Sequence, residues 1–247
     1  MLKQRVLTAL VLIPLVVWGI LALPTDWFAL ILGAFAVGGA WEWGSMAPLT
    51  SATARFLYAG AIAFCMIILY GGVDGSVLLS AVLTAAGLWW IIAVAVVMSY
   101  RNAGVHRKAR APKLMAGLVV LVPAWLSLVL LHHGMVNGPQ LVVFLMLLIW
   151  AADIGAYFAG RQFGRHKLAP HVSPGKSWEG VVGGLLLASL VAYGGGLWLG
   201  KSGEGLASFV VLGVLTVAFS VVGDLTESLI KRDIGVKDSG HILPGHG

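Results

Sequence analysis

The sequence predicts an all-α integral membrane protein, a polytopic bundle of about eight transmembrane helices. Its mean hydropathy is +0.94 and 59% of its 247 residues are hydrophobic, whereas soluble globular chains contain roughly 45–50% apolar residues. A soluble core cannot bury that excess, but lipid can solvate it, and about 20 apolar residues cross the hydrocarbon as a helix. Charged residues make up only 11% of the chain and gather between long apolar runs.

Eight apolar runs can be drawn, and Pro, Gly or charged residues separate each run from the next. The first follows Lys3 and Arg5 and ends before Pro24. Because no small-residue cleavage site stands out and similar runs follow, we interpret it as a retained helix rather than a signal peptide. The predicted spans are 6–23, 27–46, 56–72, 77–99, 114–131, 141–160, 180–200 and 206–230.

Polar residues mark the ends of several spans. Glu42 lies between two Trp residues near the end of the second span and is expected to anchor it at the membrane interface. The basic segment 101–113 separates the fourth span from the fifth. His132 and His133 follow the fifth span, and we interpret them as exposed loop residues.

The basic residues fall almost entirely on one side of these spans. If the N-terminus lies in the cytoplasm, all but one of the 16 Lys and Arg residues fall in cytoplasmic segments, and Lys201 is the exception. This asymmetry is the positive-inside pattern of membrane proteins. We therefore attribute the net charge of +6 to interaction with the membrane surface rather than with nucleic acid. The asymmetry also places the segments 161–179 and 231–247 in the cytoplasm.

Besides Glu42 near the end of the second span, acidic residues lie inside two predicted spans, where they are costly and usually functional. Asp224, Glu227, Ser228 and Lys231 follow the i, i+3, i+4, i+7 spacing and share one face of the eighth helix. Glu227 also fits a simple ion pair with Lys231. Asp224, nearer the middle of the span, is the functional candidate. Asp153 in the sixth span is open between a functional role and a hydrogen bond to a neighbouring helix.

The basic segment 161–179 contains the first of two candidate binding sequences. Its residues 173–177, SPGKS, have the look of a phosphate-binding turn at the start of the seventh helix, where backbone N–H groups can receive an anion. A P-loop is rejected because Pro170 stands where its first Gly belongs and no strand is expected before it. Attraction to anionic lipid headgroups is the alternative, and it accounts well for charges such as Arg165.

The segment 228–247 is the second candidate binding sequence. Its Lys and Arg side chains suit phosphate oxygens, and its Asp side chains suit Mg²⁺. Within twenty positions it contains Lys231, Arg232, Asp233, Lys237, Asp238, His241 and His246.

Both sequences resemble those of the phosphatidate cytidylyltransferases (CDP-diacylglycerol synthases). The tail matches the family pattern S-x-x-K-R-x-x-x-x-K-D-x-G-x-x-L-P-G-H-G, and SPGKSWEG at 173–180 matches S-P-x-K-[ST]-W-[EQ]-G. The family pattern continues with Gly, two mostly apolar residues and Asp-Arg, so we expect this chain to stop before the end of the motif and before a ninth helix. Residues 1–113 would form N-terminal helices with a cytoplasmic basic loop, and 114–247 the catalytic region.

The resemblance implies transfer of a cytidylyl group from CTP to phosphatidate, which gives CDP-diacylglycerol and pyrophosphate in phospholipid biosynthesis. Mg²⁺ is the implied cofactor and the bacterial inner membrane the implied location. The expected catalytic residues are Lys231, Lys237 and the two expected metal ligands, Asp224 and Asp238. The expected substrate-binding residues are Ser173, Lys176, Ser177, Glu179, Ser228, Arg232, His241 and His246.

Two alternative functions remain open at this point. One is a CTP-dependent polyprenol or phytol kinase. The other is a cation-coupled transporter that uses Asp153 and Asp224 as intramembrane carboxylates, although a transporter would not need the Lys-Arg-Lys-Asp cluster on one side. The sequence predicts no nucleic-acid partner. The oligomeric state is open, with a homodimer among the alternatives.

Overall fold

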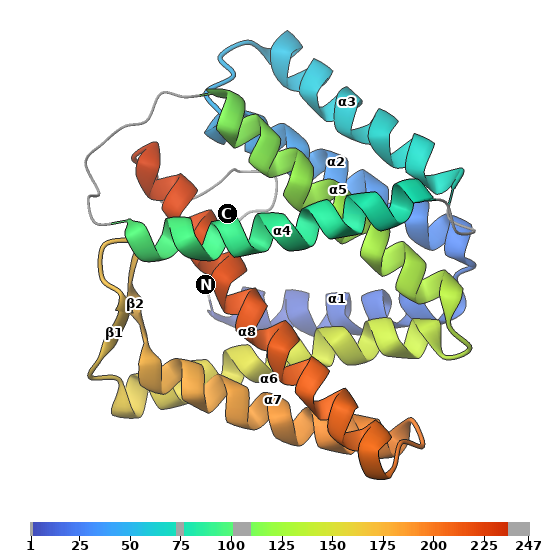
Figure 1. Ribbon diagram of the computed structural model, residues 1–247, viewed down its shortest axis with the longest axis vertical. Helices are drawn as coiled ribbons and strands as arrows, with labels where there is room; N and C mark the ends of the chain where they lie inside the picture. The colour runs from blue at the N-terminus through green and yellow to red at the C-terminus, as the bar shows by residue number, and fades with distance from the viewer. Residues whose placement is uncertain (1, 73–76, 101–109, 237–247) are drawn as a thin grey trace.

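The computed structural model describes residues 2–72, 77–100 and 110–236, and Figure 1 shows the arrangement of its elements. Eight helices occupy the eight predicted spans, which confirms the predicted fold class. They are α1 (Leu2–Ala22), α2 (Thr25–Met46), α3 (Ala52–Tyr70), α4 (Val77–Ser99), α5 (Arg110–Gly134), α6 (Gly138–Phe163), α7 (Trp178–Trp198) and α8 (Gly203–Asp233).

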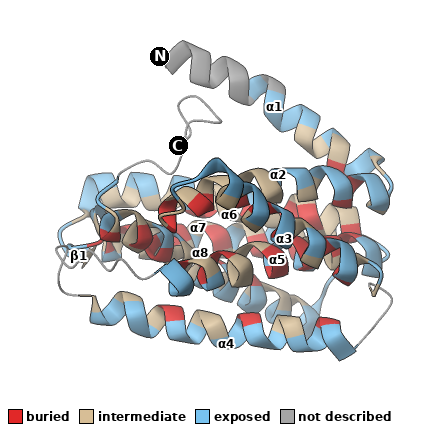
Figure 2. Ribbon diagram, turned by 90° about the horizontal axis from the view of Figure 1, so that it is seen from above, coloured by how far each residue is buried: buried red, intermediate tan, exposed pale blue. Residues whose placement is uncertain are grey.

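The helices are long and apolar enough for a membrane protein. Within the described residues, six of them, α3 to α8, could cross a membrane by length and hydropathy, and the apolar part of α1, Leu12–Ala22, is shorter. Large apolar side chains such as Phe35, Phe56 and Met98 point outward, and Figure 2 shows α4 exposed along most of its length. Exposed apolar surface of this extent suits contact with lipid.

A small antiparallel hairpin between α6 and α7 was not predicted. Strand β1 (Lys167–Ala169) pairs with β2 (Ser173–Ser177), with Lys167 opposite Ser177. The predicted turn at 173–177 is therefore wrong: this run is an extended strand that leads directly into α7. Pro174 is compatible with a strand here because a two-stranded sheet has only edge strands. The strand itself contains the Gly-Lys-Ser sequence, so no glycine-rich loop separates strand from helix, and the rejection of a P-loop stands.

Helices α2, α3 and α5 form one compact unit, which we call the N-terminal bundle. Its core consists of large side chains, including the fully buried Ile62, Leu126 and Val129. The indole nitrogen of Trp125 on α5 donates a hydrogen bond to the Ala29 carbonyl of α2 at 2.9 Å. The bundle is thus fixed by close packing of large apolar groups.

The interpretation of His132 as an exposed loop residue is wrong. It lies in the last turn of α5, only 5% exposed, and its ring stacks on Phe28 with centroids 4.3 Å apart. Its ring nitrogens contact the Thr25 hydroxyl and the Ile20 carbonyl at 2.9 and 3.0 Å. Because α5 continues three residues beyond its predicted end at 131, this residue enters the packing between α1, α2 and α5. His133 is exposed, as expected.

Helices α6, α7 and α8 form a second unit, the C-terminal bundle, with a core of smaller residues that includes Ala152, Ala188 and Ala192. The backbones of α6 and α7 approach closely: a Cβ atom at Gly155 would lie 2.6 Å from the Gly183 carbonyl oxygen. Small residues allow such contact in lipid, where van der Waals packing rather than the hydrophobic effect drives helix association.

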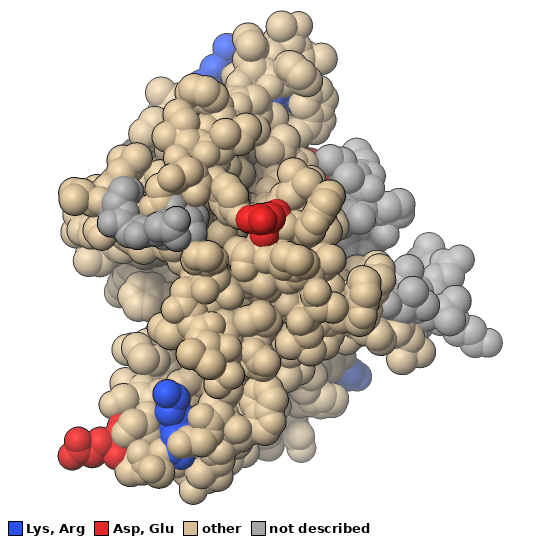
Figure 3. Space-filling model, turned by 90° about the vertical axis from the view of Figure 1, so that its right-hand side faces the viewer, with Lys and Arg blue, Asp and Glu red and all other residues tan. Residues whose placement is uncertain are grey.

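The two ends of the molecule differ in charge. Figure 3 views the end that contains the α1–α2, α5–α6 and α7–α8 connections, and this face is almost uncharged. The opposite end contains the hairpin and the last turn of α8 with Lys231 and Arg232. The cationic sequences therefore lie together at one end of the bundle.

Candidate active site

A cavity of about 240 Å³ opens between α6, β2, α7 and α8. Its polar lining comes from segments far apart in the sequence: Asp153 and Tyr157 on α6, Lys176 on β2, and Ser220 and Asp224 on α8. Glycines line the α6–α7 side, where the two helices meet backbone to backbone. The cavity thus joins the first candidate binding sequence to Asp153 and Asp224, the acidic residues of two predicted spans.

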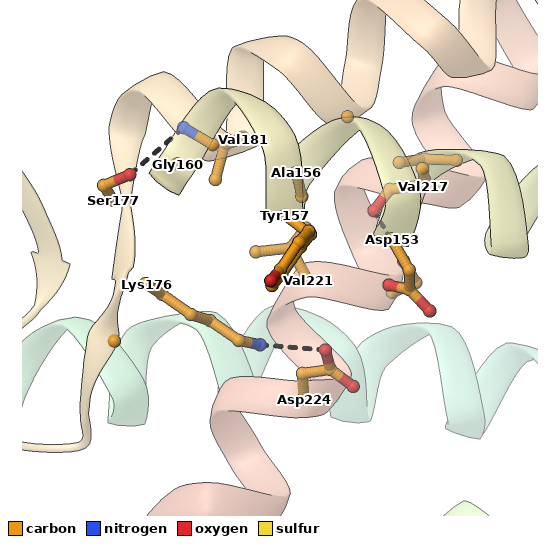
Figure 4. A pocket seen from close by; sticks show the side chains of 15 residues that line it. Asp153, Ala156, Tyr157, Gly160, Lys176, Ser177, Val181, Val217, Val221 and Asp224 are labelled. Atoms are coloured by element: carbon orange, nitrogen blue, oxygen red, sulfur yellow. Dashed lines mark hydrogen bonds and ion pairs between the residues drawn. The ribbon is translucent and has the colours of Figure 1, made fainter. Parts of the chain in front are cut away.

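Lys176 and Asp224 form an ion pair in this cavity, as Figure 4 shows. The Lys176 Nζ donates to the Asp224 Oδ2 at 2.8 Å, and the two side chains are 30% and 60% exposed. The pair is therefore open to exchange. An incoming phosphate can draw the ammonium away, and an incoming cation can bind the carboxylate.

Asp153 and Tyr157 line the same cavity from α6 (Figure 4). Both side chains are exposed, so Asp153 is not a helix-packing residue sealed in the core. The Tyr157 hydroxyl accepts a hydrogen bond from Arg161 at 2.9 Å. Arg161 can thus act at the cavity and not only at lipid headgroups, a contact that its position in a basic loop did not reveal.

The last turns of α8 position the other predicted cations. Lys231 pairs with Glu227 at 2.8 Å, which confirms the i, i+4 ion pair considered from the sequence. The Nε of Arg232 donates to the carbonyl of Val172 at 3.3 Å, and Val172 is buried between the two strands of the hairpin. Arg232 therefore connects α8 to the hairpin that carries Lys176.

Ser177 and Glu179 organise the start of α7. The Ser177 side chain is the N-cap, buried, and accepts a hydrogen bond from the Gly180 N–H at 3.2 Å. The Glu179 carboxylate accepts from the backbone N–H of His166 at 3.1 Å and lies 2.7 Å from its Nδ1. Both residues fix the hairpin to α7, and their predicted contacts with substrate stay predictions.

The remaining predicted residues divide into two groups. Ser173 on β2 and Ser228 on α8 are half-buried near the pairs described above. The others lie outside the described residues: Lys237, Asp238, His241 and His246.

The residues at the cavity suit a hard divalent cation in part. Within residues 2–72, 77–100 and 110–236, no group of three or more His, Cys, Asp or Glu side chains could hold a metal ion. Asp153 and Asp224 nevertheless place two carboxylates at one cavity. Mg²⁺ in nucleotide sites uses one or two carboxylates together with substrate phosphates and water, so this donor set fits Mg²⁺ bound together with a nucleotide.

One ion pair was missed by the sequence analysis. Lys113, which had been assigned to the basic loop 101–113, pairs with Asp233 at the end of α8 at 2.8 Å, and both side chains are buried. The two residues are far apart in sequence, and no pattern connects them.

The fold and the cavity define a class: an integral membrane protein with a polar cavity between three helices and a hairpin. Comparison with known proteins makes this specific. The sequence model of the cytidylyltransferase family matches residues 3–247, so the chain belongs to that family.

Named relatives agree with this assignment. The phosphatidate cytidylyltransferase of Pseudomonas aeruginosa is 45% identical over 248 residues, covering 100% of this chain and 90% of that protein. The phosphatidate cytidylyltransferase of Haemophilus influenzae is 42% identical over 267 residues, covering 100% of this chain and 92% of that protein. The phosphatidate cytidylyltransferase of Brucella suis is 46% identical over 140 residues, 53% of this chain and 48% of that protein.

Proposed function

We propose that this protein transfers a cytidylyl group from CTP to phosphatidate and releases CDP-diacylglycerol and pyrophosphate. The observation that carries the proposal is the meeting, in a single cavity, of Lys176 from the family-like sequence 173–180 and Asp224, the acidic candidate of the eighth predicted span. Two relatives named phosphatidate cytidylyltransferase, 42–45% identical over the whole of this chain, support the proposal. The family match also favours nucleotidyl transfer over the lipid kinase and transporter alternatives.

The reaction requires no covalent enzyme intermediate. An oxygen of the phosphatidate phosphate attacks the α-phosphorus of CTP, and the bond to the bridging oxygen of the β-phosphate breaks as pyrophosphate leaves. The chain's task is to hold two anionic substrates together and to stabilise the charge that develops on the leaving group. Lys176 on β2 would bind the nucleotide, with Ser173, Ser177 and Glu179 beside it.

The cations at the end of α8 would serve the leaving group. Lys231 and Arg232 are half-buried and exposed, respectively, on the turn that faces the hairpin. Each can bring positive charge to the pyrophosphate, and Lys231 would exchange Glu227 for a phosphate oxygen. The predicted roles of Ser228, Lys237, His241 and His246 in binding substrate extend the same site.

Mg²⁺ would be held by Asp224 and, as the sequence predicts, by Asp238. Bound there it would offset the triphosphate charge and polarise the α-phosphoryl group. The metal ion and the Lys176 ammonium would then compete for the Asp224 carboxylate. Because the Lys176 side chain is 30% exposed, its ammonium would be able to bind a phosphate oxygen if Asp224 held the metal.

We also propose that the protein lies in the bacterial inner membrane with its N-terminus and residues 231–247 in the cytoplasm, and the homodimer remains a prediction. The charge difference between the two ends of the bundle supports this orientation. Single cysteines substituted at Lys108 and Lys201 test it in intact cells with a membrane-impermeant thiol reagent. Labelling of Lys201→Cys alone is expected, and equal labelling of both would contradict the orientation.

Isotope position tests the reaction itself. Purified protein with phosphatidate and Mg²⁺ should transfer label to lipid from CTP labelled at the α-phosphorus but not from CTP labelled at the γ-phosphorus. Transfer of the γ-label would instead identify a lipid kinase. The absence of lipid labelling from either nucleotide, in protein that retains its fold, would refute both activities.

A further inference from the structure

The end of α8 is held by an ion pair that the proposed chemistry does not use. Lys113 Nζ and Asp233 Oδ2 lie 2.8 Å apart, and their side chains are only 9% and 8% exposed. Buried charges are costly to desolvate, so a buried pair is weak as a source of stability. Its presence at this position calls for another role.

The surroundings of the pair belong to the N-terminal half of the chain. The Trp43 indole nitrogen on α2 donates to the Lys113 carbonyl at 2.8 Å, and the Tyr58 hydroxyl on α3 donates to the neighbouring Leu114 carbonyl at 2.9 Å. Two helices, α2 and α3, therefore converge on the first turn of α5. Lys113 presents its ammonium from an anchored backbone.

Residues from other helices also surround Asp233. Ile230, one turn earlier on α8, packs in a cluster with Trp43, Met46 and Ala116. Tyr100, just beyond α4, lies near the Asp233 carboxylate, and burial followed by that negative charge raises the pKa of its phenol. Asp233 is thus surrounded by groups from α2, α5 and the residue that follows α4.

The last turn of α8 also carries two cations of the proposed active site. Lys231 and Arg232 immediately precede Asp233, and Arg232 donates to Val172 in the hairpin. The hairpin in turn carries Lys176, which contacts Asp224 two turns back on α8. A shift of the last turn would move the cations of α8 and, through Arg232, the hairpin.

We propose that the Lys113–Asp233 ion pair positions the active site: it fixes the last turn of α8 against α5, and so sets Lys231 and Arg232 relative to Lys176 and Asp224. Lys113 and Asp233 are positioning residues and touch no substrate. An ion pair suits this task because it fixes a distance and a direction, whereas apolar contact is non-directional. The inference rests on the proposed function.

Four variants separate positioning from stability. Asp233→Asn removes the negative charge that pairs with the buried Lys113 ammonium. The double variant Lys113→Met with Asp233→Leu replaces the pair by apolar groups of similar size, which is often neutral or stabilising for buried pairs. The exchange variant Lys113→Glu with Asp233→Lys restores a pair in reverse. Asp26→Asn is the control, because Asp26 accepts a hydrogen bond from Tyr70 near the opposite end of the bundle.

If the Lys113–Asp233 pair positions the active site, the four variants should differ in Tm and kcat. Asp233→Asn should lower both Tm and kcat. The apolar double variant should recover Tm, yet its kcat should stay roughly 10- to 100-fold below normal with KM for CTP changed less than kcat, because small misplacements of catalytic groups cost rates of this order. The exchange variant should recover most of kcat. Asp26→Asn should keep normal kcat.

Hydrogen exchange gives a readout that does not depend on the proposed reaction. In the apolar double variant the backbone amides of 229–236 should exchange faster than in the wild type, while those of α3 stay protected. If that variant recovered Tm, kcat and amide protection together, the pair would be structural only and the inference would be overturned. Changed amide protection in a protein whose wild type transfers no cytidylyl group would refute the proposed function but not the positioning of α8.

Discussion

The N-terminal and C-terminal bundles pack by different means. In the N-terminal bundle, most of the buried core residues are large, and Ile62 and Leu126 are fully buried among them. In the C-terminal bundle, α6 and α7 meet at Gly and Ala, and the space beside them is a polar cavity with Asp153, Lys176 and Asp224. One bundle therefore provides a rigid body and the other a site. Ionisable groups at membrane depth are tolerated where they line a cavity.

The largest effect is expected in the core of the N-terminal bundle. Leu126→Ala removes a fully buried side chain and should lower the free energy of unfolding by about 2–5 kcal/mol. The control Leu212→Ala alters a side chain that is 63% exposed on α8 and should cost little. Denaturant unfolding in detergent measures both. Unchanged CTP dependence of the folded Leu126 variant is also expected, and a raised KM for CTP at normal stability would contradict the division between bundles.

Replacement of Asp224 in the C-terminal bundle should have the reverse effect: it should lower activity and leave stability unchanged. Asp224→Asn keeps the shape of the side chain and removes its charge, so activity should fall at least about 100-fold with the fold intact, because a catalytic metal loses a ligand. Glu204→Gln, an exposed acid in the first turn of the same helix, is the control. Turnover measured across a Mg²⁺ titration decides the matter. Near-normal turnover of the Asp224 variant at low Mg²⁺ would exclude the metal role.

The hairpin lysine should affect nucleotide use rather than stability. A charge-assisted contact contributes about 1.5–3 kcal/mol, so Lys176→Ala should reduce kcat/KM for CTP about 10- to 150-fold. Arg165→Ala is the matched control, since an exposed basic residue near anionic lipid contributes about 1 kcal/mol that salt weakens. CTP dependence in detergent without anionic lipid separates the two. Equal, small losses would assign the whole hairpin to lipid headgroups.

The two bundles also offer a matched pair of helix caps. Ser51 caps α3 by accepting from the Ala54 N–H, and Ser177 caps α7 by accepting from the Gly180 N–H. Replacing either serine by Ala should lower the free energy of unfolding by about 1 kcal/mol. Only Ser177→Ala should also raise KM for CTP, because its cap lies next to Lys176. Parallel unfolding and kinetic measurements test this, and a kinetic effect of Ser51→Ala would refute the contrast.

The sequence predicted the helices better than the contacts between them. Long apolar runs separated by charge define spans because lipid requires them. The hairpin was not predicted because its strands are very short and because Pro174 and Gly175 in β2 are typical of a turn. His132 was misplaced because its burial depends on the three extra residues of α5 and on Phe28 of another helix.

The candidate site was predicted as separate parts. The charged residues of 161–179 and of α8 were recognised through their density and their family-like order. That Lys176 would meet Asp224 was not, because the contact depends on how the hairpin folds back over α8. Lys113 was assigned to a surface loop for the same reason: its partner, Asp233, is contributed by a helix 120 positions later.

The backbone contact between α6 and α7 restricts how substrates can enter. Two helices joined at Gly155 and Gly183 without intervening side chains cannot separate by rotating a rotamer, so they act as one wall. The described residues enclose about 240 Å³, below the roughly 300–1,000 Å³ typical of ligand pockets. The remaining walls, β2 and α8, are joined across the cavity by the exchangeable ion pair of Lys176 and Asp224. In the proposed function, a nucleotide that enters the cavity between these two walls would have to break the contact between Lys176 and Asp224.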